Sequence, residues 1–576
     1  MKISRLLFLL STLLLLGSLT SAQQRLTAFP GAEGYGKFTS GGRGGTVYYV
    51  TRLDDCADNN LVEGTLRWAL RTGDDSPRTV LFRVCGTIYL TNVLKIEHSN
   101  VTIAGQSAPG GGICIAGCKT YVSARNVIIR HIRFRAGDMP TNSFAALDVE
   151  NAKNIIVDHC SMTWSMEECL TAYDTDSTTF QWCIIGEALY NSKNKKGERA
   201  YATQWGGEHS TMHHCLITNC YNRTPRFNGV RDEANLAIGN HAHDAFVDSE
   251  FANNVIYNWG KPNSLYGGEN DTTKNHDAFG QPVGYCHVYM RNNYFRAGPT
   301  TLARKLSTRY FVQASKGGDF GHWYLDGNKF ETGNKFNYTD KAVWQDAALQ
   351  QVNDSNLLAF SPSGAHVLDE AYASSALNLQ TADEAYADVC RFAGAQLPRL
   401  DEVDTRLLQE AAGTIDPQFA GATKPEWLGI IDSPADITLS QPDTTYVSAA
   451  LFATITPYPY IGLLEGDTVP DDTDLDGIPD YWELAHNLNP NDPSDAQTCT
   501  LSALDGYTNL EFFLNGQDGE LSDPIPAARP VPNDLNDSFS RVEAVPAGRK
   551  AINLLNGLIY LQIDNKTYSP TGQETK

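Results

Sequence analysis

A run of carboxylates between residues 471 and 483 is the sharpest chemical motif in this 576-residue chain. It follows the pattern D-x-D-x-D-G-x5-E, in which alternating aspartates precede a glycine turn and a glutamate closes the loop. Calcium takes about six to eight hard oxygen ligands, and this spacing directs several carboxylates inward. The pattern predicts a structural calcium site; the alternative is an acidic linker. The predicted ligands are Asp472, Asp474, Asp476, Asp480 and Glu483.

Arg223 is the second residue with a candidate chemical role. It lies in Asn222-Arg-Thr-Pro-Arg-Phe-Asn-Gly229, at a proline-containing kink, downstream of Val157-Asp-His-Cys-Ser161. An isolated arginine needs partners from other parts of the chain, so the elements that position it decide what it can do.

Those elements are short strands that recur over more than two hundred residues. Their first apolar residues are 25 to 41 positions apart, and a constant strand signature with variable spacing is typical of a solenoid with insertions in its loops. One rung cannot bury its own apolar face, so the rungs must stack into a parallel β-helix. Side chains of successive coils then line one outer face, where Arg223 and earlier acidic residues share a groove. The marker residues are Val101, Val127, Ile155, Phe180, Met212, Val247, Val288 and Trp323.

Some reactive residue types are expected in the core instead. Cys183 and Cys215 each follow a marker by three residues, so we expect them to be stacked, buried neighbours. We expect His159, beside Asp158, to form a structural hydrogen-bonded pair rather than a catalytic one.

The net charge is −22, from 45 basic and 67 acidic residues. Such a chain is a poor nucleic-acid binder, and most of these charges solvate an exported protein. A polyanionic ligand would need local arginines and lysines or a bridging cation.

The chain begins with a charged segment, an apolar run from Leu6 to Leu19, and small residues before Gln23. This order predicts a secretory signal peptide over residues 1–22. We expect no other membrane segment and an exported monomer, located in the periplasm, at the cell surface or outside the cell.

Several ordered runs resemble polysaccharide lyase family 1, the pectate lyases, in a bacterial, Bacteroidetes-type branch. The similarity spans roughly residues 28–415. The runs include Ala28-Phe-Pro-Gly-Ala-Glu-Gly-Tyr-Gly36, Asn100-Val-Thr-Ile-Ala-Gly-Gln-Ser-Ala-Pro-Gly110, Gln204-Trp-Gly-Gly207 and the two around Asp158 and Arg223. The resemblance implies a right-handed parallel β-helix that cleaves polygalacturonate, an acidic polysaccharide, by β-elimination with calcium in its groove.

The chemistry explains the residues that this family needs. A uronate C5 hydrogen is a very weak acid, because the neighbouring carboxylate opposes a carbanion. A calcium ion on that carboxylate neutralises the charge, and a base then removes the proton. The resemblance assigns the base to Arg223. Because guanidinium groups are normally protonated, the resemblance also implies an alkaline optimum.

The resemblance implies further roles. Arg226 and Lys196 are candidates to bind substrate carboxylates or stabilise the intermediate, and Trp205 and Arg199 are candidates for substrate binding. Glu167 is the first candidate calcium ligand in the groove, followed by Asp148 and Glu168. The family pattern has aspartates where this chain has Ala145 and Thr171, which puts the groove calcium site in question.

Two alternatives remain open. A pectin hydrolase on the same fold would need paired acids, for which Glu167 and Glu168 are the one candidate pair. A non-catalytic pectin-binding solenoid would bind polygalacturonate without forming product.

The predicted organisation has five parts. The lyase-like β-helix, with a capping helix near Gly64–Leu70 and packed C-terminal helices, covers residues 23–414. It follows the signal peptide at 1–22 and precedes an extended linker at 415–470. A calcium module, similar to an EF-hand or a thrombospondin type 3 repeat, covers 471–520. A linker and a β-hairpin tail, similar to a sorting tail, cover 521–576.

Overall fold

The chain divides into two compact units, Met1–Leu521 and Ser522–Lys576. The predicted signal peptide lies outside the described residues. The computed structural model describes residues 25–138, 145–228, 246–261, 264–268, 285–305, 312–314, 322–331, 337–339, 375–444, 458–501, 506–516, 550–555, 558–563, 566–568 and 574–575.

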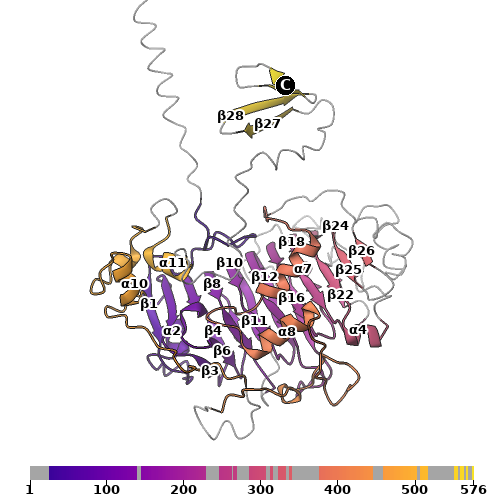
Figure 1. Cartoon of the computed structure of the whole chain (residues 1–576), viewed down its shortest axis with the longest axis horizontal. Coiled ribbons are helices and arrows are strands. Elements are labelled where there is room, and N and C mark those ends of the chain that lie inside the picture. The colour runs from indigo at the N-terminus through magenta and orange to yellow at the C-terminus, as the bar shows by residue number, and fades with distance from the viewer. Residues whose placement is uncertain are drawn as a thin grey trace, which may run out of the picture. The chain divides into compact units, whose positions relative to one another are not determined.

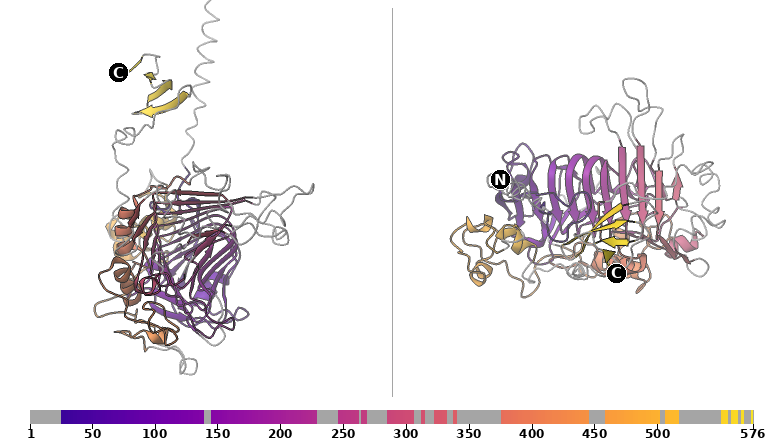
Figure 2. Two further views of the ribbon diagram at one scale, coloured as in Figure 1. Left: turned by 90° about the vertical axis from the view of Figure 1, so that its right-hand side faces the viewer. Right: turned by 90° about the horizontal axis from the view of Figure 1, so that it is seen from above.

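The first unit is a right-handed parallel β-helix. The recurring strands predicted the parallel coils, and the family resemblance implied their hand. The larger sheet pairs strands of successive coils in parallel, and Figure 2 shows them stacked side by side. The main path of this sheet contains β1 (Thr46–Val50), β2 (Arg78–Phe82), β5 (Val101–Ala104), β8 (Arg125–Arg130), β10 (Leu147–Asp158), β12 (Glu168–Gln181), β14 (Tyr201–Trp205), β17 (Arg226–Phe227), β20 (Leu265–Gly267) and β23 (Val312–Ala314). Its branches are β4 (Leu94–Ile96), β7 (Thr120–Val122), β15 (His209–His213), β18 (Phe246–Ala252), β21 (Tyr285–Arg291) and β24 (His322–Asp326).

A second sheet forms another side of each coil. Its strands pair in parallel except at the last pair, which is antiparallel. They are β3 (Gly86–Tyr89), β6 (Ile113–Ala116), β9 (Ile132–Arg135), β11 (Ser161–Thr163), β13 (Ile184–Gly186), β16 (Leu216–Thr218), β19 (Val255–Tyr257), β22 (Tyr294–Arg296), β25 (Lys329–Glu331) and β26 (Asn337–Thr339).

The strand register refines the predicted repeat. Val101, Val127 and Ile155 occupy one row, as expected, but Phe180 pairs with Val157 rather than with Ile155. The marker therefore moves by two residues at β12. Successive strand residues face opposite sides, so a shift of two keeps the apolar side chain inside.

The core of the coils confirms the prediction for cysteine, and it places His159 in a structural position without the predicted hydrogen bond to Asp158. Cys183 and Cys215 are fully buried, and all twelve cysteines are free. His159 is also fully buried and stacks between His131 and Trp182, with ring centroids 5.1 and 6.0 Å away. Its ring is therefore part of a structural stack.

Helices cover the ends and one side of the solenoid. α2 (Leu66–Arg71) lies at the predicted capping position, and α4 (Pro299–Ala303) follows β22. α7 (Ala382–Phe392) begins at a capping box on Thr381, and α8 (Glu402–Ala412) is capped by Asp401. Both α7 and α8 lie over the second sheet (Figure 1).

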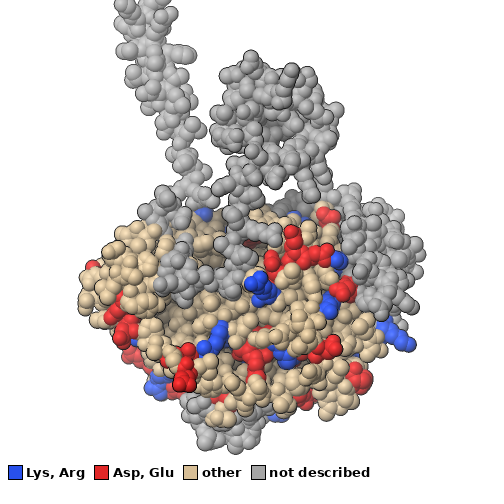
Figure 3. All heavy atoms as spheres, viewed as in Figure 1, with Lys and Arg blue, Asp and Glu red and all other residues tan. Residues whose placement is uncertain are grey.

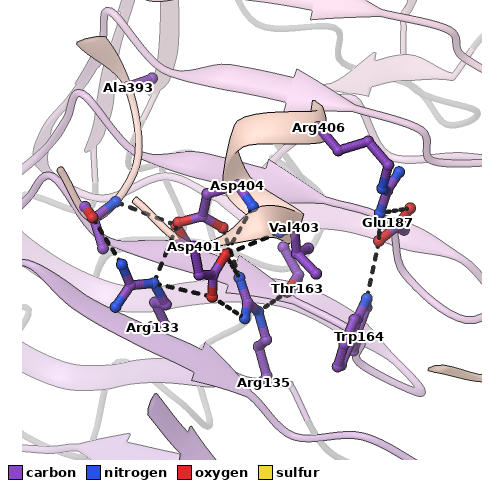
Figure 4. A network of polar contacts seen from close by, with 12 residues as sticks. Arg133, Arg135, Thr163, Trp164, Glu187, Ala393, Asp401, Val403, Asp404 and Arg406 are labelled. Carbon is purple, nitrogen blue, oxygen red and sulfur yellow. Dashed lines mark hydrogen bonds and ion pairs between the residues drawn. The ribbon is translucent and has the colours of Figure 1, made fainter. Parts of the chain in front are cut away.

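α8 is attached to the solenoid by buried charges. Arg133 of β9 contacts Asp401 at 3.2 Å, and Arg135 contacts Asp404 at 2.7 Å. Farther along the helix, Arg406 donates to Glu187 at 2.7 Å (Figure 4). A charged network in the interior is stable only when each member has a partner, so helix and coils must fold together.

The predicted extended linker at 415–470 is wrong in its described part. Residues 415–444 and 458–470 contain only a 3₁₀ turn, Pro434–Asp436, as regular structure, yet they pack on the coils. Trp427 is 8% exposed and Ile430 1%, and both join the solenoid core. The high proline content correctly indicated that helices and strands are lacking in these described residues. It did not reveal that the segment packs into the core.

Beyond this region, a short segment carries α10 (Asp480–Ala485), the 3₁₀ turn Asp495–Gln497 and α11 (Asn509–Leu514). The second unit holds a small antiparallel sheet with strands β27 (Lys550–Leu555), β28 (Leu558–Ile563), β29 (Lys566–Tyr568) and β30 (Glu574–Thr575). Among the described residues, no helix is long and apolar enough to cross a membrane.

Candidate active site

One polar row crosses the outer face of the larger sheet. Residues at matching positions of consecutive strands pair in register, and their apolar neighbours on the same strands point into the core. This alternation follows from the two-residue period of a strand. The polar row consists of Tyr121, Asp148, Thr171, Gln204, Arg226 and Tyr266.

Arg223 lies next to this row, in the turn before β17. Its backbone is left-handed, with φ of 60°, and one Nη donates to both Glu168 and Gln204. The guanidinium lies 4.5 Å from the ring centre of Tyr201. The side chain remains 22% exposed, so it is held on three sides and still reaches solvent.

The contact between Arg223 and Glu168 brings together two predicted site residues that are 55 positions apart in sequence. Glu168 is 6% exposed. Burial raises the pKa of this carboxyl, and the charge of Arg223 opposes that effect. The pair is therefore a desolvated contact at the edge of an accessible face.

Two other predicted basic residues, Lys196 and Arg199, lie beside Glu167. Lys196 lies 3.2 Å and Arg199 3.4 Å from the same oxygen of Glu167, and Asn194 donates to the other oxygen at 2.8 Å. The side chain of Lys196 is 65% exposed. Lys196 can therefore turn toward a ligand, whereas Glu167 is already occupied.

Asp148 and Arg226 complete the predicted set on this face. Lys119 lies 2.6 Å from Asp148, and Arg226 donates to the Tyr173 hydroxyl at 3.2 Å. Tyr173 also accepts from Gln204, which accepts from Arg223. A chain of hydrogen bonds thus connects the two arginines.

Trp205 corrects one prediction. It is fully buried and packs against Phe227 and Phe251 in the core, with ring centroids 5.8 and 6.1 Å away. Its neighbour Gln204 faces outward, so the alternation of the strand places Trp205 inside. The prediction that Trp205 binds substrate is therefore wrong.

Sequence reasoning missed Tyr173, Tyr201 and Gln204. All three contact Arg223 or its hydrogen-bonded partner. Strand alternation was a usable signal, because Leu170 and Ala172 are the inward residues and Tyr173 follows outward. The partner on the next coil became visible only through the register.

The candidate metal ligands separate into two cases. Within the described part of the chain, none of the close groups of metal-ligating side chains contains Asp148, Glu167 or Glu168. The C-terminal motif does form such groups, Asp472 with Asp474 and Asp476, and Asp476 with Glu483 and Asp495. Asp480, which was predicted as a ligand, is not part of either group. Both of its oxygens accept hydrogen bonds from Thr473 instead, at 2.7 and 2.6 Å.

Comparison with known proteins establishes the family. The chain is 30% identical to a probable pectate lyase C of Emericella nidulans over 509 residues, covering 88% of this chain and 96% of the relative. It is also 30% identical to a probable pectate lyase C of Aspergillus flavus, over 86% and 96% of the two chains. The chain therefore belongs to the pectate lyase family, polysaccharide lyase family 1, and is a polysaccharide lyase. No family model matches it.

Solved structures with a similar fold include the major allergen of cedar pollen, with a TM-score of 0.41 and 16% identity over 66% of this chain and 96% of the allergen. Another is a Bacillus pectate lyase in complex with trigalacturonate, with a TM-score of 0.38 and 18% identity over 63% of this chain and 98% of that enzyme.

Proposed function

We propose that this protein is an exported pectate lyase that cleaves polygalacturonate by β-elimination with Arg223 as the base. The observation that carries this proposal is the position of Arg223. Its guanidinium is fixed by Glu168, Gln204 and the Tyr201 ring, yet it is partly exposed beside a polar row on the solenoid. Family membership supplies the reaction class.

The reaction balances around this one group. Arg223 in its neutral form takes the C5 proton of a uronate, and the C–H electron pair forms the C4–C5 double bond. The C4–O bond breaks, and the leaving oxygen takes a proton. The products are a new chain end and a 4,5-unsaturated oligogalacturonide. A positioned base contributes about 10²- to 10⁴-fold to such a step.

Basic side chains near Arg223 are suited to an acidic substrate. Arg226 lies in the polar row, and Lys196 is the most exposed predicted binding residue. The Arg199 guanidinium lies 5.4 Å from the centre of the Tyr201 ring, which also contacts Arg223. Cationic groups aimed at a developing negative charge stabilise the intermediate, and they also bind the uronate carboxylates.

Calcium at this face stays a prediction without geometric support. Each of the three candidate carboxylates already has a basic partner. Asp148 pairs with Lys119, and Glu168 pairs with Arg223. Glu167 lies beside both Lys196 and Arg199. The carboxylates are not gathered into a ligand set, so the residues present do not fit a calcium ion held by the protein. The proposed mechanism therefore contains no step through calcium.

The decisive experiment replaces Arg223 with lysine and follows the ultraviolet absorbance of unsaturated product from polygalacturonate. Lysine keeps a positive charge but loses the planar fork that binds Glu168 and Gln204. We expect kcat to fall at least about 100-fold. Arg52→Lys is the matched control, because the exposed Arg52 pairs with Asp54 outside the candidate site.

Unchanged turnover in Arg223→Lys would refute Arg223 as the base. New reducing ends without ultraviolet absorbance would indicate hydrolysis. Binding without any product would indicate a pectin-binding protein.

A further inference from the structure

The carboxylates of the C-terminal segment meet in two groups that share one residue. Ligand oxygens of Asp472, Asp474 and Asp476 lie within 4.8 Å of one another, and so do those of Asp476, Glu483 and Asp495. Asp495 belongs to no sequence motif recognised above. It reaches the cluster from the 3₁₀ turn that follows α10.

Several oxygens of these carboxylates are buried without a hydrogen-bond partner. Glu483 is fully buried, and neither of its oxygens has a hydrogen-bond partner. Buried oxygens of Asp474 and Asp476 also lack partners. Burying like charges in this way is costly unless a cation joins them.

The cluster also contacts the first coils of the solenoid. The Tyr49 hydroxyl of β1 donates to Asp472, and Arg83 lies 3.9 Å from the same oxygen. Arg83 also donates to the carbonyl of Pro470 at 2.8 Å. Farther along, Arg43 pairs with Glu511 of α11 at 2.7 Å.

An apolar interface lies beside these contacts. Trp482 and Leu510 pack with Leu81 of β2 and Ala104 of β5. Gly477 has φ of 106°, and a Cβ there would lie 2.7 Å from Leu81. Figure 1 shows α10 and α11 beside β1. The loop that carries the aspartates is thus pressed against the solenoid.

We propose that Asp472, Asp474, Asp476, Glu483 and Asp495 bind a calcium ion that fastens residues 470–516 onto strands β1, β2 and β5. Asp495 takes the place that the sequence motif gives to Asp480. This calcium latch is separate from the lyase site and does not depend on the proposed function.

The donor set favours calcium over other common ions. All donors are carboxylate oxygens, whereas zinc sites typically contain nitrogen and sulfur ligands. Five carboxylates, with Glu483 able to bind through both oxygens, fit the high and flexible coordination number of calcium. Magnesium keeps most of its water and demands a strict octahedron.

The test compares Asp495→Asn with Asp480→Asn in the full chain. Calcium is titrated into chelator-treated protein, and binding is followed by calorimetry and by the thermal midpoint. We expect calcium to raise the midpoint of the unchanged protein. Asp495→Asn should weaken calcium binding at least tenfold, whereas Asp480→Asn, in the same loop, should change it less than twofold.

A thermal midpoint that calcium leaves unchanged would overturn the site. So would an Asp480→Asn variant that binds calcium as weakly as Asp495→Asn does. If Asp495→Asn does not fold, terbium luminescence sensitised by nearby Tyr49 and Trp482 provides the answer in the unchanged protein. Calcium should displace terbium and magnesium should not. Absence of luminescence would refute the site.

Hydrogen exchange tests the fastening separately. Calcium should slow exchange in β1 and β2 as well as in α10 and α11. Protection confined to residues 470–516 would show that the ion orders the segment without fastening it to the solenoid.

Discussion

At the scale of single residues, Gln204 and Trp205 are adjacent on β14 but serve opposite sides of the coil. Gln204 connects Arg223 to Tyr173 on the outer face. Trp205 fills the interior against Phe227 and Phe251. The contact to the proposed base and the packing of the core are thus separated by one position along the strand.

This separation predicts opposite effects of two alanine variants. Trp205→Ala should lower the free energy of unfolding by about 3–5 kcal/mol, because it empties a packed site, and leave KM of the folded enzyme unchanged. Gln204→Ala should leave stability within about 0.5 kcal/mol and lower kcat roughly tenfold through a misplaced Arg223. Chemical denaturation and polygalacturonate kinetics measure the two effects. A raised KM in Trp205→Ala would restore its predicted role in substrate binding.

At the scale of elements, α8 shows how a helix is attached to a solenoid through charge. Asp404 is fully buried and contacts Arg135 and Ser161. Figure 4 shows this network between the helix and the strands below it. Elsewhere on the same face, acidic and basic side chains are interspersed and exposed (Figure 3).

Asp404→Ala should therefore cost about 3–5 kcal/mol of unfolding free energy, because it removes one of the two buried carboxylates that balance Arg133 and Arg135. Asp383→Ala on α7 is the control. Its side chain is 66% exposed and pairs with Lys329, so its loss should cost about 0–1 kcal/mol. Equal midpoints for the two variants would show that the buried network does not anchor α8.

At the scale of the whole first unit, a stack of rings on successive coils predicts that stability depends on pH. Trp182 stacks on His214 with ring centroids 4.3 Å apart, and His214 also contacts Gln380 at 2.9 Å. Burial lowers the pKa of His214 to about 4. Asn253 and Asn292 adopt the same left-handed backbone on the next coils.

A buried neutral histidine binds protons less readily than the unfolded chain, so unfolding becomes easier as pH falls from about 6.5 toward 4. The contribution is on the order of 3 kcal/mol at the acid end. His214→Asn copies the residue of the following coils and should flatten this part of the stability–pH curve. Thermal midpoints between these pH values measure the change. An unaltered slope would exclude His214 as its source.

The sequence by itself determined the repeating coil, because strand alternation and the stacking of apolar faces are properties of local order. It also determined the family resemblance and marked Arg223 and the acidic loop as candidates, because these are compact motifs. It could not determine which side of β14 Trp205 occupies until the register was known.

Only the tertiary structure decided which distant residues became neighbours. Glu168 contacts Arg223. Asp495, rather than Asp480, lies with the carboxylates of the aspartate loop. Trp427 packs in the core although its segment has no regular structure. The reason is physical. A solenoid sets contacts through the register between coils and through the packing of later segments, and neither is encoded within a short stretch of chain.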